Sequence, residues 1–451
     1  MQIISNASDS VLSILRKFKK VSETSRLIKY CVQTSAEEGI LLFNLLTREL
    51  LLLSEEEFSR FSELEYLKEH WFVVPEDTNE KEYADLVKWV LSNKQKKSKN
   101  IIGYTIFPTT DCNARCFYCF ELGRSRIPMN EEAAKKVVQY ISAHCGGERV
   151  SISWFGGEPL FNLSAIDTIC EGLRSQNIEF RSKMITNGYL FDDEVVRKAV
   201  ELWNLKRVQI SLDGTEKIYN KVKAYIYRDS NAYEIVMDNI GRLLDAGIFV
   251  TVRLNMDLYN AEDLLLLVDD IAKRFGGKEG IQIYAHHLFK GNEPMAQLHT
   301  DEEWSKREEA MRLLEERIAG YGLLAKNGIN KQVKTNFCMA DSGKSVTILP
   351  DGNIGLCEHF SESEFIGHID REGFDAAMVK SWEEQMPEIP ECADCFYYPE
   401  CIRLKKCANG SICFPLLRQE KLRKTQRAIV GEYQKWKTKA VPEEEEDDND
   451  C

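Results

Sequence analysis

The sequence has no apolar run long enough to cross a bilayer, and its longest apolar stretches contain Arg or Glu. Residues 1–10 lack the basic and then apolar layout of a signal peptide. Basic residues are outnumbered, because 59 Lys and Arg stand against 72 Asp and Glu, for a formal net charge of −13. A general nucleic-acid binder is expected to carry a basic stripe instead. We therefore expect a cytoplasmic protein whose partners are neither a membrane nor a nucleic acid.

The composition disfavours disorder and a single small core. Hydrophobic residues make up 43% of the chain and charged residues 29%, as in globular proteins. The 451 residues are too many for one compact core, so we expect two or three domains. The acidic run at residues 443–450 is predicted to be a solvated end, with binding of a basic partner as the alternative.

Cysteine, by contrast, is abundant, with 14 copies. A reducing cytosol keeps thiols free, so a disulfide framework is disfavoured and the clustering of the cysteines indicates metal. Ten of them fall into two groups, within residues 112–119 and 338–413. The other four are expected to be ordinary buried or terminal thiols: Cys31, Cys145, Cys170 and Cys451.

Residues 1–92 are predicted to form a small domain of their own. The expected elements are strands at 27–33 and 71–75, a hairpin at 39–53 that turns near Thr47 and Arg48, and helices at 54–70 (capped by Ser54) and 79–91. A polar, Lys-rich linker is predicted at residues 93–100.

Residues 101–300 alternate short apolar strands with amphipathic helices, the pattern of a parallel sheet covered by helices. Six such units are too few for an eight-fold barrel, so we expect an α/β fold with an open or partial barrel. The expected strands are 103–107, 150–154, 180–185, 207–212, 249–255 and 281–286, and the clearest helices are 131–143, 193–203 and 233–246. The rest is divided into a helical bridge at 301–335, a cysteine-rich region at 336–415, and a final helix with the acidic tail at 416–451.

The first cysteine group reads C-x3-C-x2-C directly after a predicted strand and consists of Cys112, Cys116 and Cys119. This spacing lets one loop place three thiolates around an iron–sulfur cube and leaves one iron open to a small molecule. A zinc site would want a fourth ligand nearby, and none is present locally. The spacing therefore favours iron–sulfur over zinc or three unrelated thiols.

This loop resembles the signature of the radical S-adenosylmethionine (SAM) superfamily. The resemblance implies a partial (β/α)6 barrel in which a [4Fe–4S] cluster binds SAM through its fourth iron. It also implies cleavage of SAM to a 5′-deoxyadenosyl radical that abstracts hydrogen from substrate. The SAM-binding residues that the resemblance implies are Tyr118, Gly156, Gly157, Glu158, Thr186, Asn187 and Ser211. Asp213 and Gly214 follow Ser211, and they are as compatible with an ordinary turn as with a role at the cofactor.

One position departs from the family pattern. Where an Arg often meets the methionyl carboxylate of SAM, this chain has Lys223, which supplies a charge but not a bidentate fork. Arg253, on the fifth predicted strand, is an equal candidate for that role.

The second cysteine group begins with Cys338 and Cys357, which flank a predicted hairpin turning at residues 350–352. It resembles the SPASM extension of the superfamily, which carries two auxiliary [4Fe–4S] clusters. The resemblance assigns one cluster to Cys392, Cys395, Cys401 and Cys413, and the other to Cys338, Cys357 and Cys407. In the latter, Lys344 replaces the usual fourth cysteine, so water, a non-cysteine ligand or a substrate thiolate would fill the open iron. A zinc ribbon is the alternative.

Two weaker resemblances concern the base and the N-terminal domain. Glu358 aligns with an acidic residue that related sulfatase-maturing enzymes use to deprotonate substrate, and it is the candidate general base, with an ordinary surface glutamate as the alternative. Neither His286 nor His287 is assigned a catalytic role. The N-terminal domain resembles the winged-helix-like element that binds the leader of a precursor peptide as an added strand, with a simple packing cap as the alternative.

These resemblances imply a peptide maturase of the thioether-forming (sactipeptide or ranthipeptide) type. Such an enzyme would join a Cys sulfur to a carbon within a ribosomally synthesised precursor peptide, with electrons from a flavodoxin- or ferredoxin-type donor. The alternatives are a carbon–carbon crosslinking or epimerising maturase, an anaerobic sulfatase-maturing enzyme, and a non-enzymatic iron–sulfur redox carrier or sensor. Cleavage of SAM would separate the enzymes from the carrier.

Overall fold

The computed structural model describes most of the chain. The described residues are 1–18, 24–95, 100–227, 230–288, 300–325, 328–336, 338–359, 364–401, 403–407, 413 and 415–440. The predicted acidic tail and Cys451 lie outside the described residues, as do residues 96–99 of the predicted linker.

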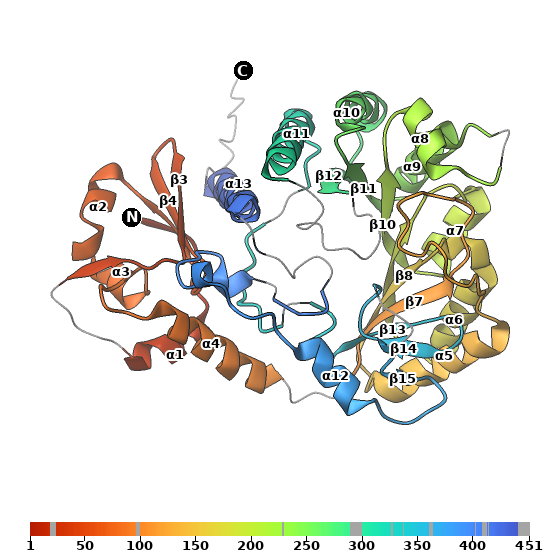
Figure 1. The fold of residues 1–451 in the computed structure, drawn as a ribbon, viewed down its shortest axis with the longest axis horizontal. Helices are drawn as coiled ribbons and strands as arrows, with labels where there is room; N and C mark the ends of the chain where they lie inside the picture. Colours follow the sequence, from red (N-terminus) through yellow and green to blue (C-terminus); the bar gives the residue numbers. More distant parts are fainter. Residues whose placement is uncertain are drawn as a thin grey trace, which may run out of the picture.

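The N-terminal part is built on a four-stranded antiparallel sheet (Figure 1). Its order is β1 (Gln2–Ser5), β5 (Leu50–Leu53), β4 (Gly39–Asn44) and β3 (Cys31–Ala36). The predicted hairpin is confirmed. Its turn is held because Oδ1 of Asn44 accepts from the backbone N–H groups of Leu46 and Thr47. Arg48 then takes a left-handed conformation, with φ of 68°.

Two predictions in this part are wrong in detail. The strand expected at residues 27–33 is two strands, β2 (Ser25–Leu27) and β3, because β2 pairs with β6 (Val73–Pro75) and β3 with β4. The helix expected at residues 54–70 begins with Ser54 as its cap but is broken into α2 (Glu55–Ser59), a 3-10 turn (Phe61–Glu63) and α3 (Glu65–Glu69). The breaks let Phe58, Phe61 and Leu64 all pack on one apolar cluster. Helices α1 (Asp9–Leu15) and α4 (Glu80–Gln95) complete this part.

The predicted parallel sheet is confirmed, and its six strands lie in reverse sequence order (Figure 1). They are β12 (Ile281–His287), β11 (Phe249–Met256), β10 (Leu205–Leu212), β9 (Phe180–Thr186), β8 (Val150–Gly156) and β7 (Gly103–Thr109). The connecting helices are α5 (Glu131–His144), α6 (Leu163–Ser175), α7 (Asp193–Glu201), α8 (Glu216–Lys223), α9 (Ala232–Asp245) and α10 (Ala261–Phe275). Apolar side chains between this sheet and its helices form the largest core.

The predicted hairpin of the cysteine-rich region extends this same sheet. Strand β13 (Ser345–Ile348) pairs parallel with β7, and β14 (Asn353–Gly355) and β15 (Gly367–His368) follow antiparallel. The backbone carbonyl of Lys344 accepts from the N–H groups of Ile102 and Gly103, at 2.9 and 3.1 Å. The cysteine-rich region is thereby joined to the edge of the barrel next to the first cysteine loop.

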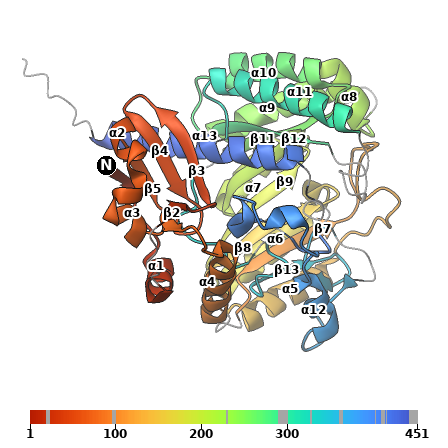
Figure 2. The same ribbon diagram turned by 60° about the vertical axis from the view of Figure 1, so that its left-hand side comes forward.

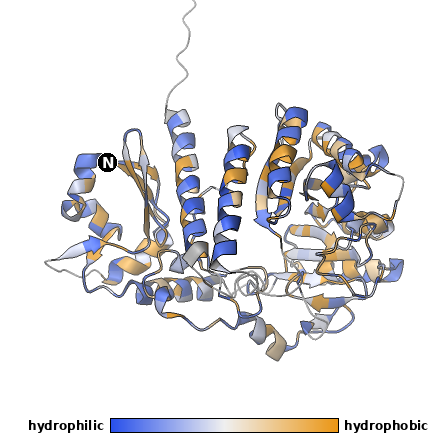
Figure 3. Ribbon diagram, turned by 45° about the horizontal axis from the view of Figure 1, so that its top comes forward, coloured by the Kyte–Doolittle hydropathy of each residue, from blue (hydrophilic) through white to orange (hydrophobic). Residues whose placement is uncertain are grey.

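Three further helices complete the fold: α11 (Asp301–Gly320), α12 (Ala376–Glu383) and α13 (Pro415–Ala440). Figure 2 shows α13 running between the N-terminal sheet and α11. Its Ile429 and Tyr433 are buried in the N-terminal core, while Arg427 forms an ion pair of 2.9 Å with Glu315 of α11. Figure 3 shows polar and apolar residues mixed along α13. Among the described helices, none combines the length and apolar character that a membrane span requires.

Candidate functional site

The first cysteine loop, which follows β7, is held against the turn after β8. The N–H of Gly157 donates to the carbonyl of Thr109 at 3.2 Å, and that of Glu158 donates to Asp111 at 2.9 Å. A Cβ added to Gly156 or Gly157 would lie 2.3 Å from a backbone oxygen of the loop, so only glycine permits this approach. The Gly-Gly-Glu-Pro sequence therefore positions the cysteine loop.

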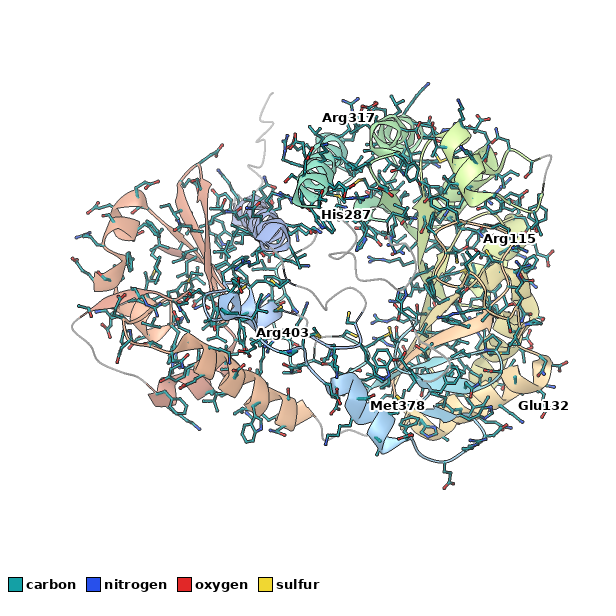
Figure 4. The ribbon with its side chains drawn as sticks, viewed as in Figure 1. Arg115, Glu132, His287, Arg317, Met378 and Arg403 are labelled. Carbon is teal, nitrogen blue, oxygen red and sulfur yellow. The ribbon has the colours of Figure 1, made fainter. Side chains whose placement is uncertain are left out.

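Arg115 fastens the loop from within (Figure 4). Its guanidinium donates to the carbonyls of Cys112 and Ala114, and its backbone N–H donates to the carbonyl of Lys223 at 2.8 Å. The loop is thus tied to the end of α8 as well as to the turn after β8.

Glu158 joins two of the predicted SAM-binding turns, those after β8 and β9. It is fully buried, and it accepts from Thr186 Oγ1 at 2.7 Å, from the Asn187 N–H at 2.8 Å and from the Leu160 N–H at 3.1 Å. Burial raises the pKa of Glu158 to about 7, although these hydrogen bonds favour its ionised form. In this structure its oxygens bind the protein, and it orders the turn after β9.

Asn187 connects that turn to the cysteine loop. Its Nδ2 donates to Oδ1 of Asn113 at 2.7 Å and lies 3.8 Å from the Sγ of Cys112. Asn113 is fully buried, and its own Nδ2 has no hydrogen-bond partner among the described residues. The residue after the first thiol of the loop thus carries an unused amide donor.

A buried charged network lies beside Tyr118. The Tyr118 hydroxyl donates to Oδ1 of Asp213 at 2.7 Å, and Asp213 forms an ion pair with Lys223 at 3.0 Å. Nδ2 of Asn255 donates to both Tyr118 and Asp213, at 3.2 and 3.0 Å. Burial lowers the pKa of Lys223, but the Asp213 carboxylate together with Tyr118, Cys116 and Tyr219 outweighs burial and raises it well above its ordinary value. Lys223 is therefore charged.

The two candidates for binding the methionyl carboxylate lie at different depths. Lys223 is buried beside Tyr118, whereas Arg253 is half-buried on β11, where it pairs with Ser211 of β10. The Nε of Arg253 is buried and has no hydrogen-bond partner among the described residues. Lys223 already forms an ion pair with Asp213, whereas the Nε of Arg253 has a hydrogen-bond donor to spare. This difference favours Arg253 as the partner of the methionyl carboxylate. Both remain predictions.

The described thiols act on one another's pKa within three sets. In the first group, the pKa of Cys112 is raised to about 12, mainly by burial, and the Glu158 carboxylate and the thiols of Cys116 and Cys119 contribute to this rise. All described cysteines are free of disulfides. Three half-buried thiols on one loop, next in sequence to an unused amide donor, fit a [4Fe–4S] cluster with one open iron.

The second group contains Cys338, Cys357 and Cys407. The pKa of Cys338 is raised to about 11, mainly by burial, and Asp341 and the thiol of Cys407 contribute to this rise. The thiols of Cys338 and Cys407 likewise raise the pKa of Cys357, which burial raises most. The carboxylate of Glu358 acts on both Cys338 and Cys357, so the predicted base lies beside this group.

The third group contains Cys392, Cys395, Cys401 and Cys413. The pKa of Cys401 is raised to about 11, mainly by burial, and the thiols of Cys395 and Cys413 contribute to this rise. Cys413 is likewise influenced by Cys395 and Cys392. A [4Fe–4S] cluster with all four irons ligated and a tetrahedral zinc ion both take four thiolates. The number of thiols in this group therefore does not distinguish the two.

One contact between the cysteine regions was not predicted. The rings of Phe120, next to Cys119, and His359, next but one to Cys357, lie 4.6 Å apart. The roles of Asp213 and Asn255 in holding Tyr118 were also missed. The Ser-Leu-Asp-Gly sequence placed Asp213 only at a turn, and no local signal marked Asn255.

The two histidines at the end of β12 have separate environments. Burial and the charge of Arg253 lower the pKa of His286 to about 3. His287, labelled in Figure 4, lies within 4.8 Å of carboxylates of Glu308 and Glu420, an arrangement that could hold a metal ion. Those carboxylates are already bound by Arg423 and Lys424, however, and the group fastens α13 to the barrel.

Residues 106–271 match the family model described as the Radical SAM superfamily. An uncharacterized protein of Methanocaldococcus jannaschii is 25% identical over 285 residues, which are 60% of this chain and 91% of that protein. A probable GTP 3′,8-cyclase of Methanococcus maripaludis is 27% identical over 158 residues, 34% of this chain. The chain spans 49% of the length of that cyclase.

Two solved structures share the fold. Streptococcus suis SuiB bound to precursor peptide SuiA has a TM-score of 0.53 at 13% identity, over 88% of this chain and 97% of that one. Native anSMEcpe with bound AdoMet has a TM-score of 0.52 at 15% identity, over 74% of this chain and 98% of that one. At these identities the likeness shows the fold alone. The chain therefore carries a radical SAM domain on the α/β fold of radical SAM enzymes.

Proposed function

We propose that this chain is a radical SAM peptide maturase that forms a thioether between a Cys sulfur and a carbon of a ribosomally synthesised precursor peptide. The observation that carries the proposal is the group of Cys338, Cys357 and Cys407. These three thiols lie together with Lys344 at the position of a fourth cysteine. A [4Fe–4S] cluster on three thiolates has one iron that a substrate thiolate can reach.

The first cysteine loop would hold the cluster that binds SAM. Cys112, Cys116 and Cys119 supply its thiolates, and the glycines after β8 allow the backbone to approach the methionyl end. Tyr118 and Ser211 would contact the nucleoside, and Lys223 or Arg253 would meet the carboxylate. When bound, the cluster and SAM supply a 5′-deoxyadenosyl radical that abstracts hydrogen from a peptide carbon. Reducing electrons would come from a flavodoxin- or ferredoxin-type donor.

The bond-forming step needs the thiol to lose its proton. In the proposed step the carbon–hydrogen bond breaks, and its hydrogen leaves as part of 5′-deoxyadenosine. The carbon–sulfur bond would then form, the thiol proton would pass to Glu358, and the remaining electron would pass to an oxidised [4Fe–4S] cluster held by Cys338, Cys357 and Cys407. The position of Glu358 beside Cys338 and Cys357 supports this role. The thiolate, rather than the thiol, is the form that binds metal and attacks carbon.

The wider fold supports a peptide as the substrate. A solved structure with this fold, SuiB, is described as bound to a precursor peptide. The antiparallel sheet of the N-terminal part has β3 at its edge, where an extended leader could add a strand. Gln426 of α13 already donates to the carbonyl of Gln33 on β3, so a leader would use the remaining backbone groups.

The test uses the reconstituted full chain with SAM and dithionite under anaerobic conditions. The peptide is a cysteine-rich precursor from a small open reading frame beside the gene, and mass spectrometry reads the product. We expect a loss of two hydrogens per crosslink, with one cysteine protected from alkylation for each. Loss of mass while every cysteine still alkylates would indicate a carbon–carbon crosslink instead. If no 5′-deoxyadenosine forms, the radical-enzyme hypothesis fails, and an iron–sulfur redox carrier becomes the better interpretation.

A further inference from the structure

A cavity of about 840 Å³ lies inside the partial barrel, away from the cysteine loops. One wall is the inner face of β9 to β12, and the other wall consists of α11 and α13. The strand residues of this wall include Gln209, Thr251 and Tyr284. Each lies two positions before a residue at the cofactor end, namely Ser211, Arg253 and His286. The cavity therefore begins about 7 Å below that end, along the same strands.

The charge of the cavity is opposite to that of the whole chain. Its charged lining residues are Lys183, Arg207, Lys424, Arg427, Lys435 and a single carboxylate, Glu315. The chain as a whole has a net charge of −13. The cavity lining is therefore positive although the chain as a whole is acidic. A cavity with this charge raises the local concentration of anions.

Two of these cations lack a counter-charge. Lys183 of β9 and Arg207 of β10 are directly paired across the sheet, and both are exposed to the cavity. Neither forms an ion pair with a described residue, whereas the other three cations each do. Like charges directly opposite each other destabilise a sheet. The guanidinium of Arg207 is held over the Phe249 ring, 4.5 Å from its centre.

We propose that this cavity binds an acidic segment of the peptide substrate, with carboxylates seated between Lys183 and Arg207. The inference rests on the proposed function and deepens it, because it names a chemical feature of the substrate. A segment held there would lie two to three residues' length below the reacting carbon. The pair would then act as an anchor that sets which part of the peptide reaches the cofactor end.

The test measures binding of a fluorescein-labelled hexaglutamate peptide to the reconstituted full chain, with hexaglutamine as the uncharged probe. We expect hexaglutamate to bind, with affinity that falls as salt rises, and hexaglutamine not to bind. The double variant Lys183→Gln/Arg207→Gln should bind hexaglutamate about tenfold more weakly. The matched control is Lys206→Gln, since Lys206 is exposed next to Arg207 but does not line the cavity. It should leave binding unchanged.

Three results would overturn the proposal. Hexaglutamate could fail to bind, or it could bind the double variant as tightly as the native chain. It could also bind only after the chain is shortened to end at Ala440, which would show that the acidic run at residues 443–450 is the occupant. Cleavage of SAM is measured in the same samples. Failure of SAM cleavage would count against the proposed function, whereas the binding result tests the cavity by itself.

Discussion

The Nζ of Lys223 lies 3.0 Å from Oδ2 of Asp213, and both side chains are buried beside Tyr118. A lysine at this position is therefore held by a carboxylate of the protein before any cofactor arrives. Removing one member of a buried ion pair leaves the other charge without compensation, which is costly.

Replacement of Lys223 by Met should both destabilise the fold and weaken SAM binding. We expect the free energy of unfolding to fall by about 3 kcal/mol, because Asp213 would stay buried and unpaired. Lys221→Met is the control, since Lys221 lies on the same helix and is exposed. Thermal unfolding and equilibrium binding of SAM measure the two effects. Equal behaviour of the two variants would show that the ion pair carries neither role.

Replacement of Gly157 by Ala should displace the first cysteine loop. The added Cβ would lie 2.3 Å from the carbonyl oxygen of Asp111, so the loop must move. We expect the variant to lose the iron of one cluster, about four atoms per chain, with the other clusters retained. Gly277→Ala is the control, because a Cβ there meets nothing within 4 Å. The iron content per chain is measured after reconstitution. A full iron content in the Gly157 variant would show that the added Cβ does not displace the loop.

His286 should make the fold sensitive to acid. Its pKa is lowered from 6.5 to about 3 in the folded chain, first by burial and then by Arg253. Between these values the unfolded chain binds more protons, so the stability is complete above pH 6.5 and is lost as the pH falls toward 3. The slope from this group approaches about 1.4 kcal/mol per pH unit.

The variant His286→Gln should show a shallower loss of stability below pH 6.5 than the native chain. Denaturant unfolding at a series of pH values measures the slope. His144→Gln, on the outer helix α5 and half-exposed, serves as the control and should keep the native slope. Identical slopes in the native chain and the His286 variant would assign the acid sensitivity to other groups.

The barrel was predictable because its evidence is local. Each strand from β7 to β12 is a short apolar run between amphipathic helices, and parallel pairing of such units follows from their order. The assignment of the thiols to three groups also came from spacing and resemblance, and it stays a prediction. In both cases the prediction needed only residues close together in the sequence or the spacing pattern of a known family.

The rest of the site depends on contacts between distant parts of the chain. Asp213 and Asn255 meet Tyr118 only because β10 and β11 end beside the cysteine loop. The parallel pairing of β13 with β7 joins segments separated by more than 200 residues, and no local pattern predicts it. The cationic cavity likewise exists only because α13 packs across the open side of the barrel. The break of the expected helix at Arg60 and Leu64 has the same origin, since packing outweighed helical spacing.

The most direct test of the central claim is transfer of deuterium from the peptide to 5′-deoxyadenosine. The cysteine-rich precursor is prepared with deuterium on its carbon atoms and incubated anaerobically with the reconstituted chain, SAM and dithionite. The account predicts 5′-deoxyadenosine carrying one deuterium, in an amount equal to the thioether formed and to the cysteine protected from alkylation. Thioether that forms while the 5′-deoxyadenosine stays unlabelled would contradict it, as would labelled 5′-deoxyadenosine with every cysteine still free.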